Sequence, residues 1–342
     1  MDTPKSSYQG IAIDPRSALE KSFDFTYEEL GMGAEPVVWK EKTKEEWKTY
    51  KIRNQDGSLS CVGQATAKIL GIHEVKEGRE FKDLSPKFIY TRRDNYPDGG
   101  MWLPNALSIA CQYGSCEEYL LPCENQGETW LNDKSQETIA CVDNAKLYKG
   151  KNYIFISSLD IDAIASVIQS GYAVLLGFRF DNDEWTDVPF LKENSSKSAG
   201  HGVAGIDFTL HKGEKSIIIE DSWGPEYGMG GHRIITETFL KARCFYAGYV
   251  TSLVTENQEV KKPSHTFNKY LKFQQKDKEV IWLQKCLQYL GLFPKNVPFS
   301  ETYGPITRKA VSDFQKKYLS TNNQGLQVGP ATLRALNTLF SI

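Results

Sequence analysis

Residues Asn54–Cys61 read Asn-Gln-Asp-Gly-Ser-Leu-Ser-Cys, and the helix-prone run Val62–Leu70 follows at once. Cys61 therefore lies in the first turn of a predicted helix, where unpaired backbone N–H groups and the positive end of the helix dipole favour a thiolate. Gln55 lies six residues earlier, across a turn of glycine and serine. Its side-chain amide and the Cys61 N–H can point at one developing oxyanion, which predicts acyl-transfer chemistry.

Two motifs downstream supply partners for this cysteine. His201 lies in Ala-Gly-His-Gly-Val-Ala-Gly (199–205), and Asp221 lies in Glu-Asp-Ser-Trp-Gly (220–224). A histidine can accept the thiol proton and later protonate a leaving group, while a carboxylate orients its ring. One isolated Cys, His or Asp is more often structural than catalytic, but three such groups and an oxyanion donor, each in its own motif, favour a catalytic site.

These motifs resemble those of the papain-like cysteine peptidases. The resemblance covers roughly residues 45–254 and includes further segments in the family's order: Leu84-Ser85-Pro86, Gly99-Gly100, Ala106-Leu107 and Gln112-Tyr113-Gly114. It implies an α+β fold with a helical half and an antiparallel β half. It also implies a cysteine-type peptidase activity, with Cys61, His201, Asp221 and Gln55 as the catalytic residues.

Three positions depart from the family pattern. Val62 stands where the family usually has Trp, Ser58 where it often has a disulfide cysteine, and Asp221 where it usually has Asn. An ionised Asp221 is expected to stabilise the His201 imidazolium more than a neutral amide can, while still orienting the ring. A Cys-His-Asp triad therefore remains workable.

The resemblance also implies a substrate-binding region. Gly99 and Gly100 lack side chains that would obstruct an extended peptide. Met101, or Trp102 if the alignment shifts by one residue, is expected to wall the pocket for the second residue before the cut. Trp223 is expected to shield the His201–Asp221 contact from water; the alternative is an ordinary core aromatic.

Hydrophobic periodicity supports the same fold class. Apolar stripes predict helices over 62–70 and 104–111, and Asp160 is a predicted cap for a helix that Gly171 ends. Residues 47–52 alternate and predict a strand that delivers Gln55. Further strands are predicted in the β-rich segments 172–180, 201–210, 216–221, 232–235 and 248–254. A helix-borne cysteine would then face a strand-borne histidine across a cleft between two subdomains.

The C-terminal part of the chain predicts a small all-α domain of three helices, over 280–290, 306–318 and 333–340. Its motifs resemble the three-helix peptidoglycan-binding domain: Leu283-Gln284, Tyr303-Gly304-Pro305, Phe314-Gln315 and Gly329-Pro330. We therefore expect an N-terminal extension (1–45) with a short helix over 17–30, a peptidase domain (46–254), a linker (255–275) and a peptidoglycan-binding domain (276–342). The extension is shorter than a typical inhibitory prosegment of the resembled family.

Composition limits the partners and the location. A net charge of -2 provides no long-range attraction to nucleic acid. No apolar run approaches a membrane span, and residues 1–20 lack the apolar core of a secretory signal. The resemblances imply polypeptide and peptidoglycan as partners and an extracytoplasmic, secreted or wall-associated location, reached after removal of a signal, by lysis or by another route. No cofactor or metal is expected.

The seven cysteines leave two alternatives open. One is a free nucleophile with up to three disulfide bonds among the other six, and the other is a set of buried free thiols. A zinc site built from Cys111, Cys116, Cys123 and Cys141 is disfavoured, because these residues form no paired CxxC motif and have no histidine nearby.

Three functions stay open at this stage. The first is a cysteine endopeptidase anchored to the bacterial cell wall by its C-terminal domain. The second is a lytic enzyme, of phage or bacterial origin, that cuts the peptide crosslinks of peptidoglycan. The third is a wall-binding protein with a catalytically dead site.

Overall fold

The computed structural model describes residues 10–16, 36–251, 262–293, 299–319 and 323–341. The predicted helix over 17–30, the end of the predicted strand at 252–254 and linker residues 255–261 lie outside the described residues. The chain divides into two compact units. The larger unit comprises residues 1–14 and 34–254, and the smaller unit comprises residues 15–33 and 255–342.

The larger unit is built on a six-stranded sheet with the order β1-β6-β2-β3-β4-β5, in which all neighbouring strands are antiparallel. The strands are β1 (Asn152–Ile156), β2 (Val174–Phe180), β3 (Ala199–His211), β4 (Glu214–Glu220), β5 (His232–Thr236) and β6 (Cys244–Thr251). The β-rich second half predicted from the sequence is confirmed, and β1 is an addition to it. Strands β2 and β3 are buried along almost their whole length, as expected for central strands covered by helices.

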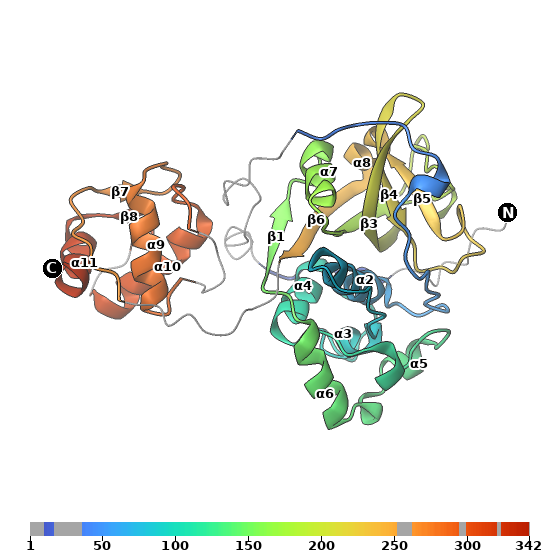
Figure 1. The fold of residues 1–342 in the computed structure, drawn as a ribbon, viewed down its shortest axis with the longest axis horizontal. Helices are drawn as coiled ribbons and strands as arrows, with labels where there is room; N and C mark the ends of the chain where they lie inside the picture. The colour runs from blue at the N-terminus through green and yellow to red at the C-terminus, as the bar shows by residue number, and fades with distance from the viewer. Residues whose placement is uncertain (1–9, 17–35, 252–261, 294–298, 320–322, 342) are drawn as a thin grey trace. The chain divides into compact units, whose positions relative to one another are not determined.

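Helices dominate the first half of the unit. They are α2 (Cys61–Lys76), α3 (Pro86–Tyr90), α4 (Leu103–Gln112), α5 (Glu128–Leu131) and α6 (Ile139–Ala145), and two more, α7 (Ile161–Gln169) and α8 (Glu237–Arg243), follow within the second half. Helices α2 and α4 contact the sheet. Helix α2 contacts β3 on the sheet side and α3 and α4 among the helices (Figure 1). Every residue from Cys61 to Glu74 is buried, so α2 is the central helix of the unit rather than a surface helix with one apolar stripe.

Short 3-10 helices connect these elements, at Lys44–Glu46, Glu118–Leu120, Lys134–Gln136, Lys146–Tyr148 and Asn182–Glu184.

The predicted start and end of α7 are both confirmed. Asp160 Oδ1 accepts a hydrogen bond from Ala163 N at 3.0 Å, and Gly171 has a φ of +97°, which favours glycine after the last helical turn.

The strand predicted over residues 47–52 is wrong, because this segment is extended but pairs with no strand. Carboxylates from the sheet accept its backbone N–H groups instead: Lys48 N donates to Asp207 Oδ2 at 3.0 Å and Tyr50 N donates to Glu220 Oε1 at 2.6 Å. The alternating pattern therefore reflects burial on one side without a hydrogen-bonded ladder.

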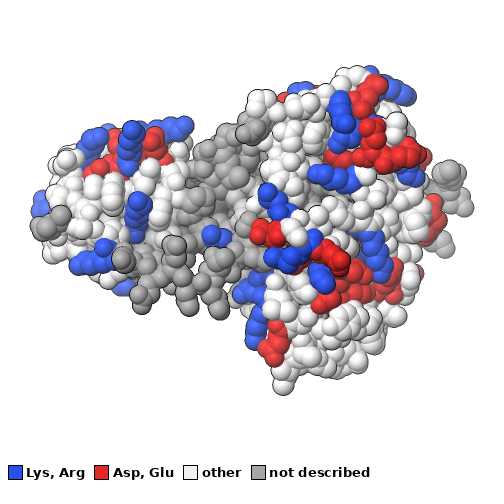
Figure 2. Space-filling view, viewed as in Figure 1, with Lys and Arg blue, Asp and Glu red and all other residues white. Residues whose placement is uncertain are grey.

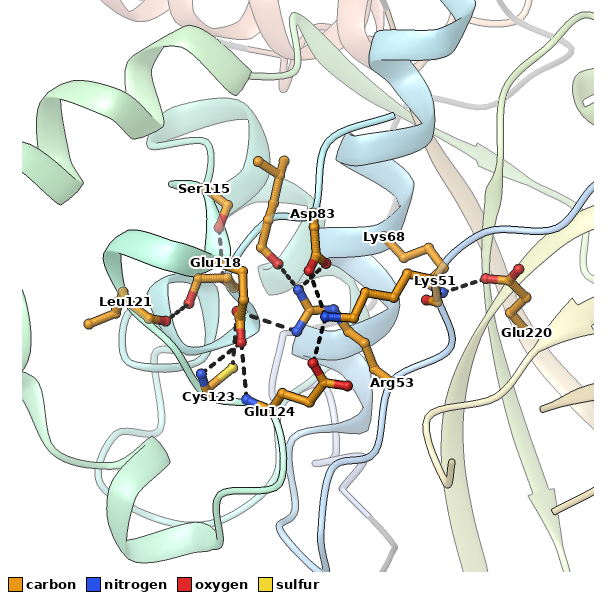
Figure 3. A network of polar contacts seen from close by, with 12 residues as sticks. Lys51, Arg53, Lys68, Asp83, Ser115, Glu118, Leu121, Cys123, Glu124 and Glu220 are labelled. Carbon is orange, nitrogen blue, oxygen red and sulfur yellow. Dashed lines mark hydrogen bonds and ion pairs between the residues drawn. The ribbon is translucent and has the colours of Figure 1, made fainter. Parts of the chain in front are cut away.

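Ion pairs fix the same segment where it approaches Gln55 (Figure 3). Lys51 Nζ lies 3.0 Å from Asp83 and 2.5 Å from Glu124. Arg53 pairs with Asp83, lies 3.3 Å from Glu118 and donates to Leu84 O at 2.8 Å. Charged side chains from the helical half thus perform the positioning that the sequence had suggested for a strand.

The smaller unit contains α9 (Glu279–Tyr289), α10 (Pro305–Tyr318) and α11 (Pro330–Phe340), as predicted, together with a two-stranded ribbon of β7 (Leu271–Lys272) and β8 (Gln327–Val328). Buried glutamines join the helices. Gln284 Nε2 donates to Thr307 Oγ1 at 2.9 Å, and Gln315 Nε2 donates to Thr332 Oγ1 at 3.0 Å. The polar residues of the sequence motifs are therefore parts of the folded core of this unit.

All seven cysteines are among the described residues, and all are free thiols. Six are buried and Cys111 is partly buried, so the structure agrees with the free-thiol alternative and contains none of the disulfide bonds considered above. None of the described helices has the length and apolar character needed to cross a bilayer.

Candidate active site

Cys61 is the first residue of α2 and is fully buried. The first turn of the helix lies directly against β3, where the Gly202 N–H donates to Cys61 Sγ at 3.4 Å. A Cβ atom at residue 202 would lie 2.9 Å from the Val62 side chain. Glycine at 202 therefore permits the close approach that places strand β3 beside the cysteine.

The sheet register brings His201 and Asp221 together. In the antiparallel pair β3–β4, Ala204 lies opposite Glu220, so the residues just before Ala204 and just after Glu220 meet at one end of the two strands. His201 Nε2 and Asp221 Oδ1 are 2.6 Å apart, and both side chains are buried. This is the pairing predicted from the two sequence motifs.

Asp221 is surrounded by hydrogen-bond donors on both carboxylate oxygens. Oδ1 accepts from Ser222 N at 2.8 Å in addition to its contact with His201. Oδ2 accepts from Trp185 Nε1 at 2.9 Å and from Arg233 Nε at 2.8 Å. Sequence reasoning missed Trp185 and Arg233. The position of Arg233 directly before Ile234 and Ile235 in a predicted strand was a signal, because a buried guanidinium requires a partner.

Charge in the site favours an ion pair between the ring and the carboxylate. Burial opposes the charged form of His201, but the charge and the hydrogen bond of Asp221, together with the Cys61 side chain, outweigh this and raise the pKa of His201 to about 9. Burial likewise opposes ionisation of Asp221, yet His201 and Arg233 hold the pKa of this carboxyl well below its usual range. An imidazolium at neutral pH follows from these opposing effects.

The other ring nitrogen of His201, Nδ1, is buried and makes no hydrogen bond of acceptable geometry with the described residues. The Cys61 side chain is close enough to raise the His201 pKa through its charge and hydrogen bonding. With Nε2 occupied by Asp221, Nδ1 is the nitrogen left to exchange a proton with the thiol.

Gln55 is tied to the segment that carries Asp221. Gln55 N donates to Ser222 O at 2.8 Å, and Ser222 Oγ donates to Gln55 Oε1 at 2.6 Å. Gln55 Nε2 donates to Ser58 O at 2.5 Å, inside the turn that leads to Cys61. These contacts place Gln55 at the same end of the sheet as the histidine and the carboxylate, beside the start of α2.

Two tryptophans enclose the His201 ring. The Trp223 ring lies 4.9 Å from it between centroids, at an interplanar angle of 35°, and the Trp185 ring lies 5.8 Å away, edge-on. Trp223 and Trp185 are only 4% and 2% exposed. Water is thereby kept away from the His201–Asp221 contact, which strengthens the attraction between their charges.

The segment Gly10–Ala12 lies over the cysteine and beside the predicted substrate-binding glycines. Met101 N donates to Gly10 O at 2.7 Å, Ala12 N donates to Met101 O at 3.0 Å, and Gly10 N donates to Gly200 O at 3.3 Å. These bonds pair Ile11 with Met101 in parallel orientation. The sequence did not predict this contact. Residues 1–45 were expected to form an N-terminal extension, and no motif in them indicated pairing with Met101.

The predicted substrate-binding residues lie beside this segment, where the resemblance implies a substrate groove. Gly100 has a φ of +78°, and a Cβ atom there would lie 3.2 Å from Gly10 O. A Cβ atom at Gly99 would lie 2.3 Å from the Leu59 side chain. Met101 is fully buried and contributes its backbone groups to the segment. Among the described residues, no group of three or more His, Cys, Asp or Glu side chains is arranged to hold a metal ion.

A solved structure with the same architecture is that of xylellain, a cysteine protease from Xylella fastidiosa. It superposes with a TM-score of 0.58 at 17% sequence identity, and the match covers 74% of the present chain and 99% of xylellain. The larger unit has the papain-like cysteine protease fold. The helical half, the antiparallel half and the position of Cys61 at the start of α2 are thus those expected from the sequence resemblance.

Sequence relatives of the papain-like unit include an uncharacterised peptidase C1-like protein of Acanthamoeba polyphaga mimivirus, 23% identical over 197 residues, which are 51% of this chain and 60% of that protein. Mouse (Mus musculus) cathepsin K is 21% identical over 229 residues, which are 66% of this chain and 67% of cathepsin K. The chain thus spans about three fifths to two thirds of the length of these relatives. Residues 276–336 match a family model described as "Putative peptidoglycan binding domain". The match includes α9, α10, the ribbon strand β8 and the first part of α11.

Proposed function

We propose that this protein is a cysteine endopeptidase that hydrolyses peptide bonds through Cys61, His201 and Asp221. The observation that carries the proposal is the buried contact of 2.6 Å between His201 and Asp221 at the strand end that lies against Cys61. The papain-like fold supports it. The raised pKa of His201, about 9, supports a protonated imidazole at neutral pH, which can donate its proton to a leaving amine.

The proposed cycle uses only groups of this chain. The Cys61 thiolate attacks a peptide carbonyl, and the Gln55 side chain with the Cys61 N–H stabilises the oxyanion that forms. His201 then donates its proton to the leaving amine, which breaks the peptide bond and leaves an acyl group on Cys61. Water, deprotonated by the same imidazole, releases the acyl group and restores the thiol. Asp221 keeps Nδ1 of the ring directed at the sulfur throughout.

A substrate cannot occupy the groove while Gly10–Ala12 fills it. The segment uses Met101 N and O, the backbone groups beside the glycines proposed to bind substrate, and it lies against Cys61. Turnover in this proposal therefore begins with the departure of residues 10–12 from the groove, and the chain's resting activity is low.

The C-terminal unit is proposed to hold the enzyme on peptidoglycan, because of the family match over residues 276–336. The proposed location is therefore outside the cytoplasm, secreted or bound to a bacterial wall. On the face of the papain-like unit shown in Figure 2, acidic and basic side chains are interspersed. That distribution and the net charge of -2 favour a polypeptide over a nucleic acid as the partner.

The same match favours a second candidate, a lytic enzyme of phage or bacterial origin that cuts the peptide crosslinks of the wall itself. Purified protein incubated with casein and with isolated sacculi separates the two. Casein cleavage without loss of sacculus turbidity supports the endopeptidase and rejects the lytic enzyme, and the reverse result rejects the first candidate.

Two variants test the catalytic assignment in the same assays. Cys61→Ala is expected to abolish turnover and to leave sedimentation with sacculi unchanged, whereas Cys111→Ala, at a partly buried thiol on α4, is the matched control and should retain both properties. Stoichiometric labelling of Cys61 by an epoxide thiol inhibitor, lost in His201→Ala, would argue against a dead site. Loss of both turnover and wall binding in Cys61→Ala would contradict the proposed division of labour between the two units.

A further inference from the structure

The second oxygen of the Asp221 carboxylate occupies a site built entirely from donors. Oδ2 accepts from Trp185 Nε1 at 2.9 Å and from Arg233 Nε at 2.8 Å, while Oδ1 contacts His201 and Ser222. An asparagine at 221 that kept its oxygen on His201 would turn its NH2 group toward two N–H donors. The surroundings therefore select a carboxylate, because two donors facing each other cannot form a hydrogen bond.

Arg233 contacts both Asp221 and Trp185 and so fixes their relative position. It is 3% exposed, lies on β5 opposite Ile219 of β4, and donates from Nη1 to Trp185 O at 3.1 Å as well as from Nε to Asp221. One guanidinium thus fixes both the carboxylate and the tryptophan that shares it. A planar guanidinium with several donors suits this geometry, whereas a lysine has one flexible ammonium group.

Other charges near the site are engaged elsewhere. Glu220, which directly precedes Asp221, pairs with Lys68 of α2 and lies 3.3 Å from His232 Nε2. Arg53, which lines the same small cavity as Lys68 and Asp221, pairs with Asp83 and Glu118. On the other side, Glu184, next to Trp185, lies 2.6 Å from Arg243. Among the described residues, Arg233 is the cation that contacts the Asp221 carboxylate other than His201 itself.

We propose that Arg233 is a positioning residue that, with Trp185, holds the second oxygen of Asp221 so that the first stays on His201 Nε2, and that Asp221 and Arg233 act as one unit. This inference rests on the proposed function for its kinetic consequence. Arg233 also offsets the negative charge that an aspartate brings to a position where the resembled family has a neutral amide. The pair therefore accounts for the departure at residue 221 noted in the sequence.

The test is a double-mutant cycle of Asp221→Asn and Arg233→Met, read by the titration of His201 in protein with labelled histidine rings and by the pH profile of kcat/KM. Arg233→Met is expected to raise the pKa of His201 by about one unit, since a cation near the ring is lost, and to lower kcat/KM at least tenfold. Asp221→Asn is expected to lower the pKa of His201. The double variant should be at least about threefold more active than Asp221→Asn, because one opposing donor and the unpaired buried cation are both removed.

Two further variants separate positioning from general destabilisation. Arg92→Met breaks another arginine–carboxylate pair, in which Nη2 lies 2.5 Å from Glu137, and should leave the His201 titration unchanged. Arg233→Lys keeps the charge but not the fork of donors, so it should preserve the His201 pKa and still reduce kcat/KM. If Arg233→Met does not fold, the kcat/KM of Arg233→Lys tests the positioning role instead.

Failure of this inference is distinct from failure of the proposed function. An active wild type, with a His201 titration unmoved by Arg233→Met, an unchanged kcat/KM in Arg233→Lys and no gain in the double variant, overturns the positioning role alone. The expected titration shifts in a protein that cleaves no peptide support the Asp221–Arg233 unit and overturn the peptidase.

Discussion

The backbone of Gly10 lies directly on Cys61: a Cβ atom at residue 10 would be 3.0 Å from the sulfur and 1.9 Å from Leu59 O. Glycine is therefore required for the segment to lie at this depth in the groove, because any larger residue would collide with backbone that cannot move aside. The same closeness explains why Cys61 is fully buried in a protein whose proposed nucleophile must meet a substrate.

Gly10→Val is expected to increase the rate of peptide hydrolysis several-fold, because the added side chain forces the segment away from Leu59 and Cys61. Initial rates on a fluorogenic peptide measure the effect. Ile13→Val is the control, since Ile13 is 77% exposed and should tolerate the change without altering the rate. A slower or unchanged rate in Gly10→Val would show that the segment does not restrict access to the cysteine.

The alkaline limit of activity is expected near pH 9, where His201 loses its proton and with it the imidazolium needed by the leaving amine. The folded-state pKa lies above the ordinary value of 6.5, so the stabilisation from the His201–Asp221 pair is fully present below about pH 6.5 and is lost as pH rises through about 9. Profiles of kcat/KM and urea unfolding between pH 5 and 10 measure both effects. Activity that already falls near pH 6.5 would contradict the ion pair.

Lys68→Met is expected to destabilise the papain-like unit by about 3–5 kcal/mol, because it leaves the buried Glu220 carboxylate without its ammonium partner. Lys68 and Glu220 are 6% and 3% exposed. Urea denaturation gives the change in the free energy of unfolding. The double variant Lys68→Met, Glu220→Gln should recover part of the loss, and a single variant as stable as the wild type would mean that the pair contributes nothing.

Local patterns in the sequence were sufficient to predict the helix that begins at Cys61. The proximity of His201 to Asp221 was predicted from the resemblance of their motifs to those of the papain-like peptidases, and the antiparallel pairing of β3 with β4 accounts for it. The prediction of a strand over 47–52 was wrong for a physical reason. The backbone N–H groups of this segment donate to the carboxylates of Asp207 and Glu220 and not to a partner strand.

The sequence did not predict several contacts between distant parts of the chain. Trp185 and Arg233 lie on segments separated from Asp221 by intervening turns, and only the packed sheet shows that both donate to one oxygen. Gly10–Ala12 carries no charge, cap or periodic pattern, so nothing local indicated that it pairs with Met101. Such residues are specified by the three-dimensional fit and leave little trace in composition or spacing.

Trapping of the acyl-enzyme by rapid acid quench and peptide mass spectrometry tests the central claim most directly. With a peptide ester as substrate, we expect a substrate-derived acyl group on the peptide that contains Cys61. The adduct should accumulate during the first turnover and be absent from Cys61→Ala. Hydrolysis that continues in Cys61→Ala, with no adduct on Cys61 in the wild type, would contradict it.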